Sequence, residues 1–150
     1  MTTVYDVPAK NLIDEVAKEL AKDKTFTIPE ENIFSKTGVD KENAPATRNW
    51  WQVRCASVFR KIYINNGIGI EKLRSYYGGK RNRGSKPSKA RAGSGSIIRR
   101  AVQQLEKAGY VTNIKGKGRV VTAKGRAFLD DISKKTLPSV KDEYPTLEKY

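Results

Sequence analysis

Histidine is absent from this sequence, and cysteine occurs once, as Cys55. Without histidine, the Ser-His and Cys-His pairs of nucleophilic catalysis and imidazole–metal sites are excluded. A single cysteine excludes an internal disulfide and a metal site built from several thiolates. The glycine-rich stretch 78–95 lacks the Gly-Lys-Ser/Thr triplet of a phosphate-binding P-loop. We therefore expect no enzymatic activity, no metal and no cofactor.

Long apolar runs are also missing. No stretch of 18 residues is apolar enough to cross a membrane, and the sequence does not open with a signal-peptide pattern. Both observations favour a cytoplasmic protein. The length fits one domain, which we expect to cover residues 1–137, with residues 138–150 as a flexible tail.

Acidic residues are scarce in the middle of the chain. The net charge is +14, and residues 54–126 hold 19 lysines and arginines but only two acids, Glu71 and Glu106. The segments on either side are nearly neutral. Such a charge favours an acidic partner, either RNA, DNA or an anionic membrane surface.

A helix is predicted from about Trp50 to Asn65, and the rest of the chain is expected to pack around it. Apolar residues recur at steps of three and four along one face of this helix: Trp51, Cys55, Val58, Phe59 and Ile62. Trp50 is expected in the core rather than stacked on a base. A second face is basic and comprises Arg54, Ser57 and Lys61, with Arg60 on its flank.

An amphipathic helix is predicted from Asp6-Val7-Pro8 to about Lys22, with Asp6 as its N-cap. Residues 25–47 are expected to be irregular and anchored to the core by their apolar side chains, namely Phe26, Ile28, Ile33 and Phe34. Thr47 or Asn49 would cap the central helix. Gly67 would end it in a left-handed conformation.

A short helix from Ile70 to Tyr76 or Tyr77 follows, with both tyrosines expected in the core, and completes a helix-turn-helix pattern. Residues 78–95 contain six basic residues, no acid and no large apolar side chain. We expect a flexible loop there that becomes ordered on a polyanion.

The last third of the chain predicts a helix, a hairpin and a final helix. Ser96 would cap a helix over 97–108, in which Arg99 and Arg100 occupy the first turn and point away from the core. Two strands, 110–114 and 119–122, would be joined by a basic tip that carries Lys115, Lys117 and Arg119. A helix capped by Thr122 would run to about Lys135. This order of elements predicts a mainly α fold with a small β-hairpin, a winged-helix-like helical bundle around a central amphipathic helix.

Several ordered stretches resemble one known family. They are Val4-Tyr5-Asp6-Val7, Lys36-Thr37-Gly38, Asn49-Trp50-Trp51 with Arg54-Cys55-Ala56-Ser57, Tyr77-Gly78-Gly79-Lys80-Arg81-Asn82-Arg83-Gly84, Gly95-Ser96-Ile97-Ile98-Arg99-Arg100-Ala101-Val102-Gln103-Gln104-Leu105-Glu106, and Gly118-Arg119 with Thr122. From about Thr3 to Leu129 the chain looks like ribosomal protein nineteen of the small subunit, in its archaeal and eukaryotic form. Val39-Asp40 departs from the usual basic pair, and nothing beyond Pro138 matches.

The resemblance implies a structural constituent of the small ribosomal subunit, in its head, that binds small-subunit rRNA, meets neighbouring ribosomal proteins and takes part in subunit maturation. It implies no membrane and no small-molecule substrate. The implied RNA-binding residues lie on the central helix, the glycine-basic loop and the later helix: Arg54, Ser57, Arg60, Lys61, Lys80, Arg81, Arg83, Arg99 and Arg100. The basic hairpin tip adds Lys117 and Arg119.

Three alternatives remain open from the residues. Arg54 and Arg60 could pair with acids of the first helix, such as Asp14 or Glu15. Arg99 and Arg100 could be a solvated surface. The whole chain could be a winged-helix DNA-binding transcriptional regulator, although Gly95 lies 17 positions after Gly78, where such a regulator usually has a short turn.

Overall fold

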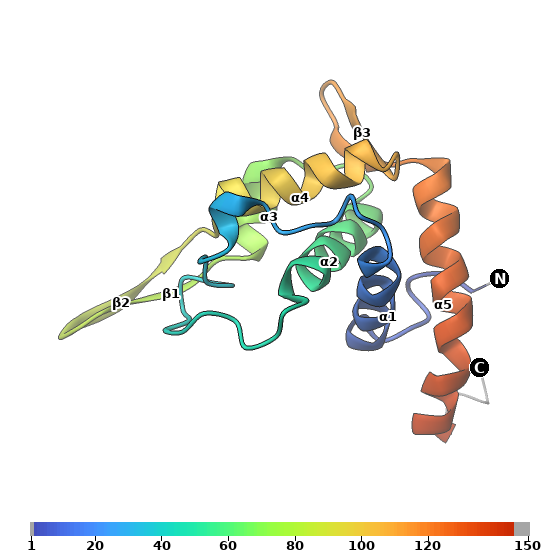
Figure 1. The fold of residues 1–150 in the computed structure, drawn as a ribbon, viewed down its shortest axis with the longest axis horizontal. Helices are drawn as coiled ribbons and strands as arrows, with labels where there is room; N and C mark the ends of the chain where they lie inside the picture. The colour runs from blue at the N-terminus through green and yellow to red at the C-terminus, as the bar shows by residue number, and fades with distance from the viewer. Residues whose placement is uncertain (1, 146–150) are drawn as a thin grey trace.

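The computed structural model describes residues 2–145. Its elements follow in the order α1 (Ala9–Ala21), the short 3₁₀ helix η1 (Glu30–Asn32), α2 (Trp50–Asn65), α3 (Ile70–Tyr76), β1 (Gly79–Arg83), β2 (Lys86–Arg91), α4 (Gly95–Lys107), β3 (Val111–Ile114), β4 (Gly118–Val121) and α5 (Ala123–Glu143). Helix α2 lies between α1 and α4, and α5 packs along α1 at one end of the molecule (Figure 1). The prediction of a mainly α, winged-helix-like bundle is confirmed.

Helix α2 forms the centre of the core, as its sequence pattern predicts. The five residues of its apolar face are fully buried, namely Trp51, Cys55, Val58, Phe59 and Ile62. Trp51 donates a hydrogen bond from Nε1 to Oε1 of Gln104, 2.7 Å away, which ties α2 to α4. Trp50 is 7% exposed and packs edge-on against Trp51, which confirms its place in the core.

The hairpin β3–β4 is joined to the core. Val111 and Val121 pair across the two strands, and both are buried. A bridge between Ile68 and Arg119 adds two backbone hydrogen bonds of 2.9 and 3.1 Å. Thr122 caps α5 as expected, because its side chain accepts a hydrogen bond from the Gly125 amide.

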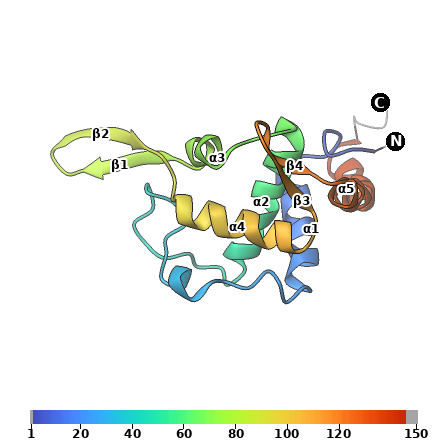
Figure 2. The ribbon, with the colours of Figure 1, turned by 90° about the horizontal axis from the view of Figure 1, so that it is seen from above.

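The largest departure from expectation is residues 78–95, which form the antiparallel hairpin β1–β2 rather than an irregular loop. Backbone pairing needs no apolar side chain, so composition alone did not reveal the strands. Gly84, with φ of +70°, makes the turn, and its amide donates to Oδ1 of Asn82. The hairpin projects from the end of the molecule opposite α5 (Figure 2).

Several helix ends also differ from prediction. Ser94, not Ser96, caps α4 by accepting from the Ile97 amide. Asp6 does not cap α1, because its carboxylate accepts from the amide and hydroxyl of Thr3 instead. Asn66, with φ of +47°, takes the left-handed position after α2. The cap of α4 is thus two residues earlier than predicted and the left-handed position after α2 is one residue earlier, at Asn66 instead of Gly67, while α1 has no side-chain cap.

Helix α5 continues to Glu143, past its expected end near Lys135, with Pro138 inside it. Val140 and Thr136 are buried where α5 packs along α1, and this packing holds the helix together beyond the proline. The flexible tail remains a prediction, and residues 146–150 lie outside the described part. Within residues 2–145, no helix is both long and apolar enough to cross a membrane.

The irregular segment 25–47 is only partly anchored. Phe26 is buried and Ile28 packs against the core, as predicted. Ile33 and Phe34 were expected to do the same, but Ile33 is 52% and Phe34 is 92% exposed. They follow η1 directly, and this short helix turns their side chains away from the core.

Candidate nucleic-acid interface

Arg54 is held in place on the basic face of α2. Its Nη2 donates to the carbonyl oxygen of Thr37 at 2.7 Å, and its guanidinium carbon lies 4.4 Å from the centre of the Tyr77 ring. Burial lowers the pKa of Arg54 from its usual value, while the neighbouring Tyr77 hydroxyl opposes the shift. Arg54 is therefore half-buried and oriented, with its charge at the surface between α2 and residues 35–39.

Tyr76, the last residue of α3, and Tyr77, which follows it, line the same face of α2. The hydroxyls of Ser57 and Tyr77 are hydrogen-bonded at 2.7 Å, and burial raises the pKa of Tyr77. Lys61 places its ammonium 4.4 Å from the centre of the Tyr76 ring. Tyr76 is 46% exposed, so the expectation that it lies in the core is wrong. Lys61 and Tyr76 together form a cation–aromatic pair that is open to solvent.

The arginines of α2 do not pair with the first helix in the part of the chain that the structure describes. Glu15 binds Lys18 instead, and Arg54 is bound to Thr37. Arg60 is half-buried, and its Nε finds no hydrogen-bond partner among the described residues. A buried guanidinium nitrogen without a partner is costly, and because Nε is buried, an acceptor outside the protein could reach Arg60 only through its Nη groups.

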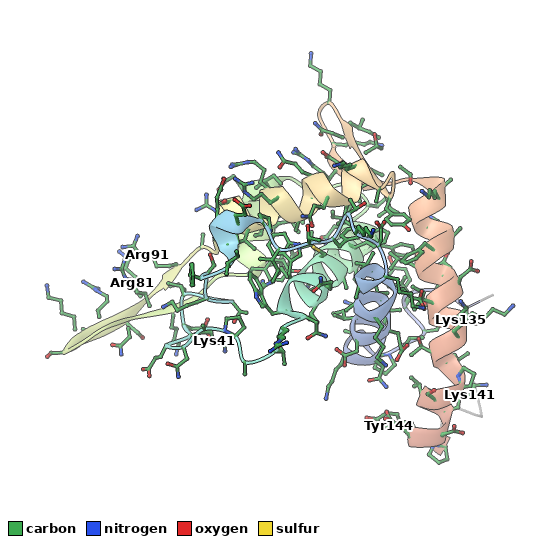
Figure 3. The ribbon with its side chains drawn as sticks, in the orientation of Figure 1. Lys41, Arg81, Arg91, Lys135, Lys141 and Tyr144 are labelled. Atoms are coloured by element: carbon green, nitrogen blue, oxygen red, sulfur yellow. The ribbon has the colours of Figure 1, made fainter. Side chains whose placement is uncertain are left out.

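The hairpin β1–β2 presents cations in facing pairs. Arg81 lies opposite Lys89, and Arg83 lies opposite Lys86. Arg91 faces Gly79, two residues before Arg81, so strand alternation places it on the same face as Arg81. Figure 3 shows the Arg81 and Arg91 side chains on one side of the hairpin. Directly opposed like charges are unfavourable in a sheet, and a bound polyanion would relieve that repulsion.

Three of these cations, Lys86, Lys89 and Arg91, were not among the predicted binding residues. All three are exposed on β2. Their spacing of three and then two residues does not reveal a shared face, and a register shift lies between Arg81 and Arg83. Only the pairing of the two strands shows that they complete the surface of Arg81 and Arg83. We call these five cations the hairpin face.

The two arginines of α4 differ in their surroundings. Arg99 is exposed, as predicted for a residue that points outward. Arg100 is half-buried and forms an ion pair with Glu31 of η1. Its charge is therefore partly neutralised within the protein, and Arg99 is the more available of the two.

The β3–β4 tip lies apart from the hairpin face. Lys115 and Lys117 are exposed there. Arg119 is not at the tip, because its Nε donates to Oε1 of Glu106 at 3.3 Å and both side chains are half-buried. Figures 1 and 2 both show the two hairpins projecting from different parts of the molecule. The structure therefore separates Lys117 and Arg119 from the hairpin face.

The described residues offer little for catalysis. No group of three acidic or cysteine side chains among them could hold a metal. Cys55 is buried, and burial raises its pKa to about 12, so its thiolate is not accessible as a nucleophile.

Comparison with known proteins identifies the family. A sequence profile described as "Ribosomal protein S19e" matches residues 3–139. Curated relatives named small ribosomal subunit protein eS19 come from Aeropyrum pernix, 42% identical over all of this chain and 99% of the relative, and from Haloarcula marismortui, 40% identical over the same shares. A relative from Ascaris suum, named small ribosomal subunit protein eS19G, is 39% identical over 88% of this chain and 90% of its own length.

Matches of this extent, over nearly the whole of each chain, agree with the resemblance that the sequence motifs indicate. The family is one of structural ribosomal proteins rather than enzymes, which confirms the expectation that this protein is not an enzyme. The chain belongs to the S19e family of ribosomal proteins.

Proposed function

We propose that this protein is a structural constituent of the small ribosomal subunit and binds small-subunit rRNA. The proposal is supported by relatives named as small ribosomal subunit proteins at about 40% identity over full length. The resemblance also implies a place in the head of the subunit, contacts with neighbouring ribosomal proteins in the cytoplasm, and a part in subunit maturation. These finer assignments belong to the same proposal.

The observation that carries the proposal is the hairpin face. It presents five cations without an acid on either strand, and it makes no contribution to the apolar core. RNA helices are bound by shape, through phosphates and 2′-hydroxyls, rather than by a base code. A narrow two-stranded ribbon of arginines and lysines is suited to such contacts, because guanidinium groups bind phosphate with two parallel hydrogen bonds.

Arg54 and Arg60 extend this surface to the bundle itself. Arg54 reaches the surface beside Thr37, and Arg60 has an unpartnered Nε. Ser57 lies one turn from each, bound to Tyr77. We infer that these residues fix the bundle on the RNA, while Lys80, Arg81 and Arg83 reach along it. Lys61, Arg99, Lys117 and Arg119 are further candidates for contact.

The alternative of a DNA-binding regulator is less well supported. A winged-helix regulator presents the helix after the turn to the major groove. Here the hairpin β1–β2 lies between α3 and α4, so it precedes that helix and projects beyond it (Figure 2). In addition, Arg100 of α4 is engaged with Glu31.

Sedimentation of cell extract tests the proposal. The protein should migrate with small subunits and whole ribosomes at moderate salt and should be released at high salt, because counterions compete for the phosphates. A double variant, Arg81→Glu with Lys89→Glu, should fold normally and fail to enter subunits. The matched control is Lys134→Glu with Lys141→Glu on exposed positions of α5, which should enter them normally. Normal entry of the folded hairpin variant would contradict the assignment of the hairpin face.

A further inference from the structure

A cavity of about 440 Å³ lies where the hairpin joins the bundle. Residues 35–39 form one side, and the beginning of α4 with Gly93 and Ser94 forms the other. Three cations line it, namely Lys36, Arg54 and Arg74, and none of its lining residues is acidic. Its volume falls within the range of pockets that hold small organic ligands.

Two of the three cations are oriented before any ligand arrives. Arg54 is fixed by the Thr37 carbonyl and the Tyr77 ring. Arg74 donates from Nε to the carbonyl oxygen of Gly93 at 3.0 Å and from Nη1 to Glu71. A guanidinium has five N–H donors, so one or two fixed bonds leave others for a ligand. Orientation in advance reduces the entropy that binding would otherwise cost.

The start of α4 adds a positive end to the same cavity. Ser94 caps the helix by accepting from the Ile97 amide, and it also lines the cavity. The amides of the first turn have no acceptor within the helix, and the helix dipole is positive there. Together with the three cations, this end favours an anionic group such as a phosphate.

The remaining wall is apolar and aromatic. Tyr77, Val39 and Ile97 line the cavity between the polar groups. A phosphate ion alone would leave these side chains in contact with water. A flat heterocycle that is linked to a phosphate would meet both kinds of wall at once.

We propose that this cavity binds one nucleotide that is turned out of the RNA, with its phosphate at Lys36 and Arg74 and its base against Tyr77, Val39 and Ile97. The proposal rests on the proposed function, because it places the nucleotide in the RNA that the hairpin face contacts. Unpaired bases in loops and bulges are the ones that proteins read individually, by stacking and by edge contacts. Binding of this nucleotide would thus fix the position of the protein along an RNA helix that the hairpin face otherwise recognises only by its shape.

Titration of the isolated full-length protein with nucleoside 5′-monophosphates tests this, followed by amide chemical shifts. Saturable shifts should appear at Thr37, Gly93 and Ser94, with a Kd on the order of 1 mM, because one nucleotide offers few contacts. Inorganic phosphate should bind the same residues at least several-fold more weakly.

Substitutions separate the two halves of the site. Val39→Phe fills the apolar side and should abolish saturable binding of the monophosphates. If that variant does not fold, Ala92→Leu fills the cavity from an exposed position and should do the same. Lys36→Gln should weaken binding several-fold, whereas Lys41→Gln, an exposed lysine of the same segment outside the cavity, should not.

The proposal is overturned if no monophosphate gives saturable shifts at the cavity, if phosphate alone binds equally well, or if both filling variants bind like the unmodified protein. This titration needs no ribosome, whereas sedimentation with subunits needs no free nucleotide. A protein that enters subunits but binds no monophosphate would therefore refute the cavity and leave the proposed function standing. A protein that binds a monophosphate at the cavity but does not enter subunits would refute the ribosomal function and leave the cavity as a nucleotide site.

Discussion

The molecule contains two antiparallel hairpins of similar length that are stabilised in different ways. In β3–β4, Val111 and Val121 are buried, and Ile68 pairs with Arg119 from the loop after α2. In β1–β2, every residue of β2 and all of β1 after Gly79 are exposed. An isolated two-stranded hairpin is marginally stable in water. The β3–β4 hairpin is therefore stabilised by the core, whereas the β1–β2 hairpin has no such support.

Charge shows the same contrast. Arg119 of β4 forms an ion pair with Glu106 of α4. The charge of this cation is therefore neutralised within the protein where β3–β4, the docked hairpin, packs on the core. The hairpin face carries like charges in direct opposition, Arg81 to Lys89 and Arg83 to Lys86. The hairpin that packs on the core and the hairpin that we propose to bind RNA are thus separate, and changes in one should leave the other largely intact.

The largest expected difference concerns thiol reactivity. In a Ser85→Cys variant, the new thiol at the exposed hairpin turn should react with a disulfide reagent roughly 10³-fold or more faster than Cys55, because Cys55 reacts only when the core opens. Stopped-flow absorbance would resolve the two phases. Equal rates would show that the core around α2 opens as readily as the hairpin.

The next largest effect is on RNA affinity. Arg81→Gln with Lys89→Gln should weaken binding to purified small-subunit rRNA by roughly 10- to 100-fold and lower the slope of log K against log salt by about 2. Lys115→Gln with Lys117→Gln, on the docked hairpin, should cost less than about 10-fold. Filter binding at several salt concentrations measures both. Equal losses would place the docked hairpin on the RNA as firmly as the hairpin face.

A matched pair of glycines compares the two turns. Gly118 has φ of +86°, and an added Cβ would lie 2.7 Å from the carbonyl oxygen of Ile68. Gly118→Ala should therefore reduce the free energy of unfolding by roughly 2–3 kcal/mol, through backbone strain and a broken bridge. Gly84 has φ of +70° with nothing near its Cβ, so Gly84→Ala should strain only the hairpin turn. Urea unfolding followed by tryptophan fluorescence would show a shift for the first variant and almost none for the second.

The smallest expected effect is on stability at alkaline pH. It involves Tyr63 of α2 and leaves the β1–β2 hairpin unaffected, because that hairpin contains no tyrosine. Burial and the hydrogen bond to Asp130 raise the pKa of Tyr63 to about 12 from an ordinary value of 10.0. The folded state keeps the Tyr63 proton that the unfolded state releases, so this contribution to stability is complete below pH 10 and is lost as the pH rises towards 12.

Urea midpoints measured across that pH range should fall less steeply for Tyr63→Phe than for the unmodified protein. Tyr76→Phe is the control, since it removes a tyrosine hydroxyl near the same end of α2 from a side chain that is 46% exposed. Identical curves for Tyr63→Phe and the unmodified protein would exclude a role for this hydroxyl.

Much of the fold follows from local patterns in the sequence. The apolar spacing of Trp51, Cys55 and Phe59 predicts α2 and its buried face, because a helix repeats its contacts every three to four residues. The same holds for α4, whose buried residues include Ala101 and Leu105. The family motifs and the scarcity of acids in the middle of the chain predict a ribosomal protein with a basic surface, since both are properties of the residues themselves.

Tertiary structure decided the features that depend on distant residues. The strands of β1–β2 carry no apolar alternation, so only their mutual pairing reveals the hairpin face. Arg100 and Arg119 look like free cations in the sequence, but Glu31 and Glu106 reach them only after folding. Helix α5 passes Pro138 because α1 lies against it. Local spacing determined the helices, and composition determined the sign of the charge. Contacts across the fold decided which of the charged side chains are neutralised within the protein, because neutralisation depends on distance in space rather than in sequence.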